Sequence, residues 1–131
     1  MRLIDTSICI AILRESSPRL RSRFRAAMAD GIAVSSITSA ELYVGVAKSA
    51  DRNRNGRSVR DLLAAVTVLP FEVRAAQAYG VIRSHLERRG QIIGPLDLLI
   101  AAHAIAEDAV LVTNNTREFT RVPTLELEDW I

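Results

Sequence analysis

Three acidic residues stand at positions where an α/β fold would gather them, and their side chains suit metal chemistry. Asp5 follows a short apolar segment, Glu41 lies near the start of a predicted helix, and Asp97 lies within residues 94–106. That segment is apolar on nearly every side, so its helix is expected to be buried and to take Asp97 with it. A buried carboxylate needs a partner, and the one lysine, Lys48, is far away in sequence. A divalent cation shared by the three acids is the interpretation that this pattern favours.

Further candidates lie in the segment Thr113–Phe119 and beside Asp5. Glu118 is the remaining acid of the segment, and we expect it to complete the catalytic group with Asp5, Glu41 and Asp97. Thr6, Thr113 and Asn115 are expected to orient a water molecule or the substrate. Asn114-Asn115 also fits a plain turn capped by Thr116, and that alternative stays open.

Each acid also has a structural explanation, because acidic side chains favour helix N-termini. Asp5 fits a helix cap, Thr38-x-x-Glu41 fits a capping box, and Asp97 comes two residues after Pro95. Three capping acids need not converge, whereas these three are expected at one rim of the sheet. Their joint placement favours a functional site.

The chemistry expected of such a site is hydrolysis of phosphodiester bonds. Carboxylate oxygens suit Mg²⁺, with Mn²⁺ as a substitute, whereas zinc prefers cysteine and histidine. Apart from Lys48, the 17 basic residues are arginines, whose planar guanidinium groups bind phosphate and stack on bases. Several of them form clusters, which favours an RNA partner, although solvated helix faces would give the same pattern: Arg19, Arg21, Arg23 and Arg25; Arg52, Arg54, Arg57 and Arg60; Arg83, Arg88 and Arg89.

The order of elements predicts the α/β class, as a three-layer α/β/α sandwich with a central, mostly parallel sheet of four or five strands. Strands are expected at residues 2–5, 32–36, 67–71 and 110–113, with 124–127 as the candidate fifth. Helices are expected at about 6–13, from Pro18, at 38–49, around 59–66, at 73–90 and from Pro95 onward, with an exposed loop at 49–57. Ligands of such sheets bind beyond the carboxyl ends of the strands, where Asp5 and Thr113 are expected.

Length and composition indicate one folded domain spanning residues 1–131. Hydrophobic residues make up 49% and charged residues 24% of the 131, which excludes a disordered chain. Cys9 is the one cysteine, so no intrachain disulfide forms and a reducing cytoplasm is expected. Asp5 interrupts the apolar opening, which argues against a signal peptide, and no apolar run is long enough to span a membrane.

Four segments of the chain resemble those of PIN domains, in particular the VapC toxins of bacterial toxin-antitoxin pairs. They are LIDTSICI, SSITSAELYVGVAKS, GPLDLLIAAHAIA and LVTNNTREF, and the resemblance extends through the closing LEDW. It implies a Mg²⁺-dependent endoribonuclease whose metal-binding acids are Asp5, Glu41 and Asp97. The chain is most similar to the enteric branch, which implies initiator tRNA, cut in its anticodon loop, as substrate. It also implies a VapB-like antitoxin, a homodimer, and binding of the toxin-antitoxin complex to promoter DNA. The chain departs from the pattern at Asn115, where many PIN domains have aspartate, and Glu118 is the candidate to replace it.

Two other classes of function fit parts of the sequence. A phosphoryl-transfer domain also places an aspartate after its first strand, but Asp5-Thr6-Ser7 lacks a second aspartate and no lysine follows a late strand. A noncatalytic RNA- or protein-binding module of PIN-like fold would explain the arginines and leave Asp97 without a role. RNA cleavage that EDTA abolishes would separate the enzyme from this module.

Overall fold

The computed structural model describes residues 1–15 and 17–131, and in this part of the chain five short strands form one parallel sheet. Their order across the sheet is β3-β2-β1-β4-β5, and every neighbouring pair is parallel. The strands are β1 (Arg2–Ile4), β2 (Ile32–Ser35), β3 (Thr67–Leu69), β4 (Val110–Val112) and β5 (Leu127–Glu128). The chain runs outward from β1 to β3 on one side and then crosses to β4, so the strand order reverses between β1 and β4. A ligand site is expected at this reversal, beyond the carboxyl ends of the two strands.

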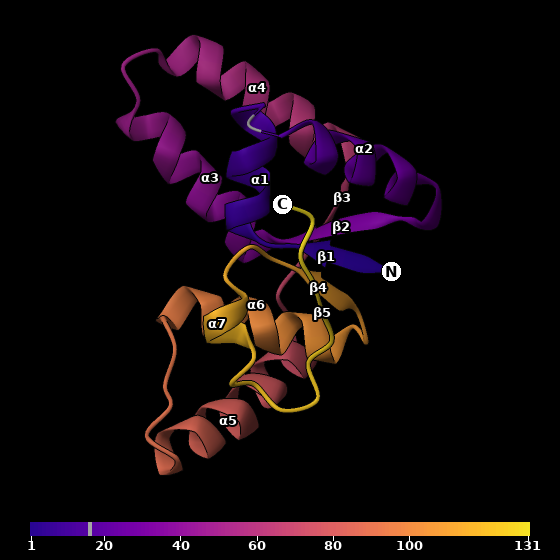
Figure 1. The fold of residues 1–131 in the computed structure, drawn as a ribbon. Helices are drawn as coiled ribbons and strands as arrows, with labels where there is room; N and C mark the ends of the chain where they lie inside the picture. Colours follow the sequence, from indigo (N-terminus) through magenta and orange to yellow (C-terminus); the bar gives the residue numbers. More distant parts are fainter. Residues whose placement is uncertain (16) are drawn as a thin grey trace.

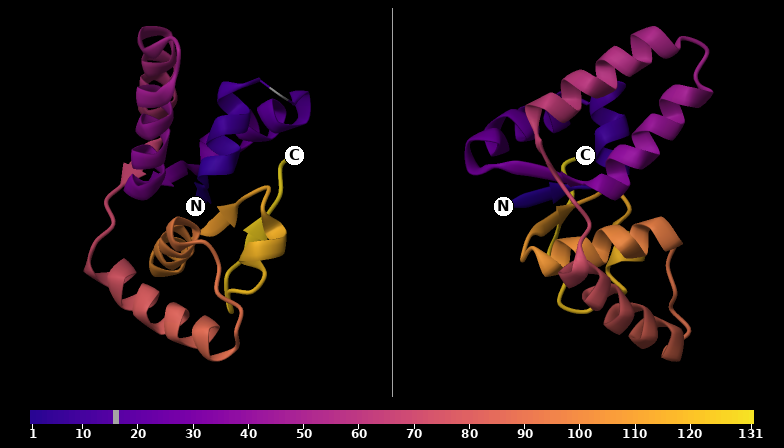
Figure 2. Two further views of the ribbon diagram at one scale, coloured as in Figure 1. Left: turned by 90° about the vertical axis from the view of Figure 1, so that its left-hand side faces the viewer. Right: turned by 180° about the vertical axis from the view of Figure 1, so that it is seen from behind.

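Helices cover the sheet on both faces, which confirms the predicted three-layer architecture (Figure 1). One layer holds α1 (Thr6–Leu13), α2 (Pro18–Ala27), α3 (Ser36–Lys48) and α4 (Arg52–Ala65), with a short 3₁₀ turn at Met28–Asp30. The other layer holds α5 (Val73–Arg88), α6 (Pro95–Ala106) and α7 (Thr116–Phe119). The helices α3 and α4 pack side by side and extend together beyond the sheet (Figure 2).

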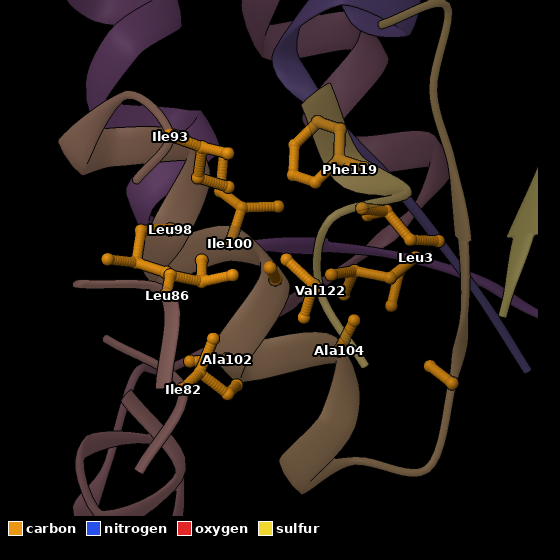
Figure 3. Packing of buried hydrophobic residues seen from close by; sticks show 14 residues of the cluster. Leu3, Ile82, Leu86, Ile93, Leu98, Ile100, Ala102, Ala104, Phe119 and Val122 are labelled. Carbon is orange, nitrogen blue, oxygen red and sulfur yellow. The ribbon is translucent and has the colours of Figure 1, made fainter. Parts of the chain in front are cut away.

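Two hydrophobic cores lie on the two faces of the sheet, because alternate residues of each strand point in opposite directions. Ile4 and Val112 belong to the core under α1–α4, which also includes Trp130 near the end of the chain. Leu3 and Leu111 belong to the core under α5–α7. Side chains of α5 and α6 meet Leu3, Phe119 and Val122 in this second core (Figure 3).

Two predicted helix starts are wrong, and the N-terminal caps explain why. The helix α3 begins at Ser36 instead of Thr38, because the side chain of Ser35 accepts a hydrogen bond from the Ile37 N–H. Most of the loop predicted at 49–57 belongs to α4, whose N-cap Asp51 accepts a hydrogen bond from the Arg54 N–H. Both helices therefore start earlier than their apolar patterns.

Several other expectations are confirmed. The helix α5 ends as predicted, since Gly90 follows it with a φ of 63° and its N–H donates to the Glu87 carbonyl. Cys9 is a buried free thiol. Across the described residues, no helix is both long enough and apolar enough to cross a membrane.

Candidate active site

The acids predicted from the sequence meet at the carboxyl edge of the sheet, around the reversal between β1 and β4. Asp5 directly follows β1, Glu41 lies on α3, Asp97 lies in the first turn of α6, and Glu118 lies on α7. The charges of Asp5, Glu41 and Glu118 all raise the pKa of Asp97, which shows that the four carboxyl groups share one region. The fold therefore gathers side chains that lie more than a hundred residues apart in sequence.

Asp5 is buried and held by three donors. Its Oδ1 accepts hydrogen bonds from Ser7 Oγ at 2.6 Å and from the Ile8 N–H at 3.0 Å, so Asp5 caps α1 while facing the other acids. Its Oδ2 accepts a hydrogen bond from Thr113 Oγ1 at 2.5 Å. Burial raises the pKa of Asp5, and these hydrogen bonds oppose that rise. Asp5 therefore both caps α1 and belongs to the acidic group.

Glu41 is positioned by Thr6, the residue after Asp5. The Thr6 hydroxyl lies 2.6 Å from Glu41 Oε1 and 3.2 Å from Thr38 Oγ1, and its single proton is best used by the nearer carboxylate. Because Ser35 caps α3, the capping box proposed for Thr38 and Glu41 is wrong. Glu41 is thus free of a capping role and belongs to the rim.

Asp97 and Glu118 form an unequal pair. Glu118 receives a hydrogen bond from the Gly94 N–H at 2.8 Å and another from Asn115 Nδ2 at 2.5 Å. The Gly94 N–H is the main cause that lowers the pKa of Glu118. Burial, followed by the charges of Glu118 and Asp5, raises the pKa of Asp97 to about 6. Asp97 is half-buried, less deeply placed than its apolar helix predicted, because it lies in the first turn at the rim.

Asn115 links the two members of this pair. Its Nδ2 is 2.5 Å from Glu118 Oε2 and 3.5 Å from Asp97 Oδ2. Its backbone N–H donates to Thr113 Oγ1 at 2.9 Å. Asn115 therefore orients carboxylates with its amide and has a structural part in the turn before α7.

The sequence did not single out two contributors to this site. Ser7 holds Asp5, and its position two residues after the aspartate is a recognisable signal for a local hydrogen bond. The backbone N–H of Gly94 holds Glu118, and no side-chain pattern announces a backbone donor.

The chemistry of this group fits a divalent cation. Four carboxylates supply hard oxygen ligands, and burial together with the charges of Glu118 and Asp5 raises the pKa of Asp97, an effect that a bound cation would oppose. As the side chains lie, no three acids, histidines or cysteines among the described residues are close enough together to hold one ion. The residues therefore fit a cation in charge and ligand type, while binding would require the carboxylates to draw together.

A cavity of about 280 Å³ opens beside Glu41, between α1, α3 and α4. Leu42 and Val59 are among its lining residues, and Arg14 and Arg54 also line it. The two guanidinium groups can hold phosphate, so the cavity offers a path for a polyanion that reaches the acidic group.

The model of the PIN domain family matches residues 2–125 of the chain. Ribonuclease VapC2 of Rickettsia felis is 43% identical over 129 residues, which cover 98% of this chain and 96% of the relative. The tRNA(fMet)-specific endonuclease VapC of Shigella flexneri is 38% identical over 128 residues, covering 98% and 96%.

Solved structures give the same similarity. The crystal structure of VapBC2 from Rickettsia felis bound to a DNA fragment from its promoter matches with a TM-score of 0.95 and 38% identity, covering 99% of this chain and 98% of the other. The crystal structure of DNA-bound VapBC from Salmonella typhimurium gives the same TM-score, identity and coverage. The chain therefore shares its overall fold with these solved structures.

Proposed function

The chain belongs to the PIN-domain family and, within it, to the VapC ribonucleases; from this premise we propose that it is the toxin of a type II toxin-antitoxin pair and hydrolyses RNA with the help of Mg²⁺. One observation carries this proposal. Four carboxylates share the rim beyond β1 and β4, where burial, followed by the charges of Glu118 and Asp5, raises the pKa of Asp97 to about 6. Such crowding destabilises the fold unless a cation offsets it, so it is expected at a metal-dependent catalytic site.

In this proposal Asp5, Glu41 and Asp97 hold the ion, and Glu118 completes the catalytic group. When bound, Mg²⁺, or Mn²⁺ in its place, supplies positive charge for the transition state and lowers the pKa of the attacking water. The neighbouring residues keep the carboxylates in place. Thr113 and Ser7 hold Asp5, and Thr6 holds Glu41.

Asn115 has a positioning role in this proposal. Its amide holds Glu118 beside Asp97, and its backbone N–H fixes the Thr113 hydroxyl that reaches Asp5. With Thr6, these residues orient the carboxylates and, through them, the RNA. The reaction does not use the ribose 2′-hydroxyl as nucleophile, so the products carry 5′-phosphate and 3′-hydroxyl ends.

We infer that the substrate is initiator tRNA, cut in its anticodon loop. The Shigella and Salmonella relatives, both 38% identical to this chain over nearly their full length, are tRNA(fMet)-specific endonucleases by name, which supports this substrate. An anticodon loop presents single-stranded phosphates and splayed bases, which suit a rim with arginines beside it. Arg14 and Arg54 would hold phosphates on the Glu41 side of the cut.

We also propose the assembly that the similar complexes suggest. A VapB-like antitoxin would bind and silence the enzyme, the toxin would form a homodimer, and the toxin-antitoxin complex would bind its own promoter DNA. The structure of Rickettsia VapBC2 bound to a fragment of its promoter and that of DNA-bound Salmonella VapBC support the antitoxin and the DNA. The chain would act in the cytoplasm as a single domain spanning residues 1–131.

The experiment that tests this function incubates antitoxin-free protein with initiator tRNA, and separately with elongator methionine tRNA, in Mg²⁺ or in EDTA. We expect one cut in the initiator tRNA, lost in EDTA and lost with the Asp5→Asn variant. Cleavage that persists in EDTA would overturn the metal-dependent reaction. Binding of tRNA without any cleavage would favour a noncatalytic module, and equal cleavage of both tRNAs would overturn the proposed substrate.

A further inference from the structure

His103 is a polar residue inside an apolar stretch of α6, six residues after Asp97. Its neighbours Ala101, Ala102 and Ala104 are fully buried, and His103 itself is 0% exposed. Its Nδ1 lies 2.8 Å from Ser35 Oγ, which is 68 residues away in sequence. This contact is the one hydrogen bond of the His103 ring among the described residues, because the buried Nε2 has no hydrogen-bond partner there.

This contact matters because Ser35 is both the last residue of β2 and the N-cap of α3. Its Oγ accepts a hydrogen bond from the Ile37 N–H at 3.1 Å, in the first turn of the helix that carries Glu41. Having accepted there, the hydroxyl has its single proton left to donate, and Nδ1 of His103 is placed to accept it. The ring proton then resides on Nε2, which lies 3.9 Å from Oε1 of Glu107, the residue that caps the C-terminal end of α6.

A second contact holds the same ring against the start of α3. Phe71 meets His103 edge-on, with ring centroids 5.5 Å apart and an interplanar angle of 79°. The Phe71 N–H donates to Ser36 Oγ at 3.0 Å, so Phe71 is itself tied to the first residue of α3. The imidazole is therefore held by Ser35, which caps α3, and by Phe71, which is bonded to the first residue of α3.

We propose that His103 is a positioning residue of the acidic site, which sets the distance between Asp97 on α6 and Glu41 on α3. The two helices lie on opposite faces of the sheet and approach each other at the end of β2 (Figure 1). The link joins points six residues from each acid, since Asp97 precedes His103 on α6 and Glu41 follows Ser35 on α3. The two acids must lie close together to bind one ion. A hydrogen bond that holds their helices in a fixed relative position therefore affects the affinity for the metal.

Packing alone does not explain a histidine at position 103. An apolar side chain would fill the same space without leaving a buried nitrogen unpaired, and an unpaired buried polar atom lowers stability. The hydrogen bond to Ser35 is the property that an apolar residue cannot supply. The inference rests on the proposed function, since it requires that Asp97 and Glu41 bind one ion.

The test measures Mn²⁺ affinity by electron paramagnetic resonance, together with kcat and KM for tRNA cleavage, in matched variants. His103→Leu removes the hydrogen bond and keeps an apolar volume, whereas His103→Asn keeps an acceptor near the position of Nδ1. Ile100→Val removes one methylene from the same buried helix and controls for loss of packing. We expect His103→Leu to weaken Mn²⁺ binding about tenfold and to lower kcat with little change in KM. We expect His103→Asn to restore most of the affinity and Ile100→Val to match the wild type.

Wild-type Mn²⁺ affinity in a folded His103→Leu protein would overturn the proposal, as would an equal loss in His103→Leu and Ile100→Val. If His103→Leu does not fold, Ser35→Gly removes the same hydrogen bond from the other side, because glycine is tolerated at helix N-caps. A wild-type affinity in Ser35→Gly would then overturn it. A wild-type protein that binds no Mn²⁺ would instead refute the proposed function, so the two failures are distinguishable.

Discussion

Thr113 Oγ1 donates a hydrogen bond of 2.5 Å to Asp5 Oδ2 and so joins the residues that follow β4 and β1. The two strands are neighbours in the sheet, at the place where the strand order reverses. The same hydroxyl oxygen accepts the Asn115 N–H at 2.9 Å, so it connects the first acid to the turn that leads to Glu118. The carboxylate of Asp5 is thereby fixed before any ligand enters.

We expect Thr113→Val to lower tRNA cleavage about tenfold, while Thr113→Ser keeps it. The Thr113 hydrogen bond lowers the pKa of Asp5, so its loss leaves the buried carboxyl more often protonated. The Asn115 N–H also loses its acceptor, and together these changes should reduce stability by about 1–3 kcal/mol. Cleavage assays and urea unfolding of the two variants check both effects. Equal activity in Thr113→Val and the wild type would contradict the positioning of Asp5 by this hydroxyl.

Asp97→Asn should abolish cleavage and leave the fold intact, because it removes one ligand charge at nearly constant volume. In EDTA the variant should unfold at a higher temperature than the wild type, since the charges of Glu118 and Asp5 no longer repel a carboxylate there. Asp108→Asn makes the same change on an exposed acid beyond the other end of α6 and serves as the control. Full cleavage by a folded Asp97→Asn protein would remove Asp97 from the site.

Glu118 and Asn115 are predicted to differ in their effect on metal binding. Glu118→Gln should weaken Mg²⁺ affinity and slow cleavage more than Asn115→Ala, because a neutral amide contributes little charge to a cation site. Glu118 now accepts hydrogen bonds from two donors, the Gly94 N–H and Asn115 Nδ2. The amide group of the glutamine would point its own N–H at one of these donors. Magnesium titrations of cleavage compare the two variants. The reverse order would assign the greater role to Asn115.

The acidic group could be predicted from the sequence because its members follow strands or open helices. Asp5 comes after an apolar strand, and Asp97 follows Pro95 at the start of an apolar helix. Such positions lie at one edge of a parallel sheet. The order of strands and helices in the sequence was therefore enough to predict that the acids lie close together. The parallel sheet also follows from the alternation of strands and helices, whereas the order of its strands was not predicted.

The contacts that position these acids could not be predicted, because they join distant segments. Ser35 and His103 lie 68 residues apart, and Thr6 and Glu41 lie 35 apart. The start of α4 was missed for a different reason. Asn55-Gly56 resembles a turn, yet Gly56 is buried within α4. The helix starts at the cap that Asp51 provides, and the local Asn-Gly pattern does not reveal this.

The contribution of His103 to the stability of the metal-free protein should fall as the pH decreases below about 6.5. Burial lowers the pKa of His103 below its ordinary value of 6.5, and the charge of Glu107 only partly opposes this. The unfolded chain therefore binds the proton more readily, so the contribution of neutral His103 is complete above pH 6.5 and is lost as the pH falls toward its folded pKa. Ser35 and Phe71, which contact the ring from other elements, carry no charge.

Urea unfolding in EDTA between pH 5 and pH 7.5 checks this prediction on the wild type and on His103→Leu. The wild type should lose more stability than the variant as the pH falls. Both proteins retain the other titrating groups, including Asp97 and Glu128, so their difference isolates His103. Parallel pH curves for the two proteins would contradict a buried, neutral histidine.

Arginines beside the acids, and not the acids themselves, should set RNA affinity. Arg14 and Arg54 line the cavity that contains Glu41, whereas Arg21 and Arg25 lie on the exposed side of α2. The double variant Arg14→Ala/Arg54→Ala should weaken tRNA binding and reduce the log-log dependence on salt by roughly 0.7 for each lost phosphate contact. Arg21→Ala/Arg25→Ala removes the same charge from the control surface and should change binding less.

Asp5→Asn should bind at least as tightly as the wild type, because it removes negative charge close to the scissile phosphate. Fluorescence anisotropy on antitoxin-free protein, at several salt concentrations and in EDTA, separates binding from cleavage. If the two arginine pairs have equal effects, the cavity beside Glu41 is not the path of the RNA.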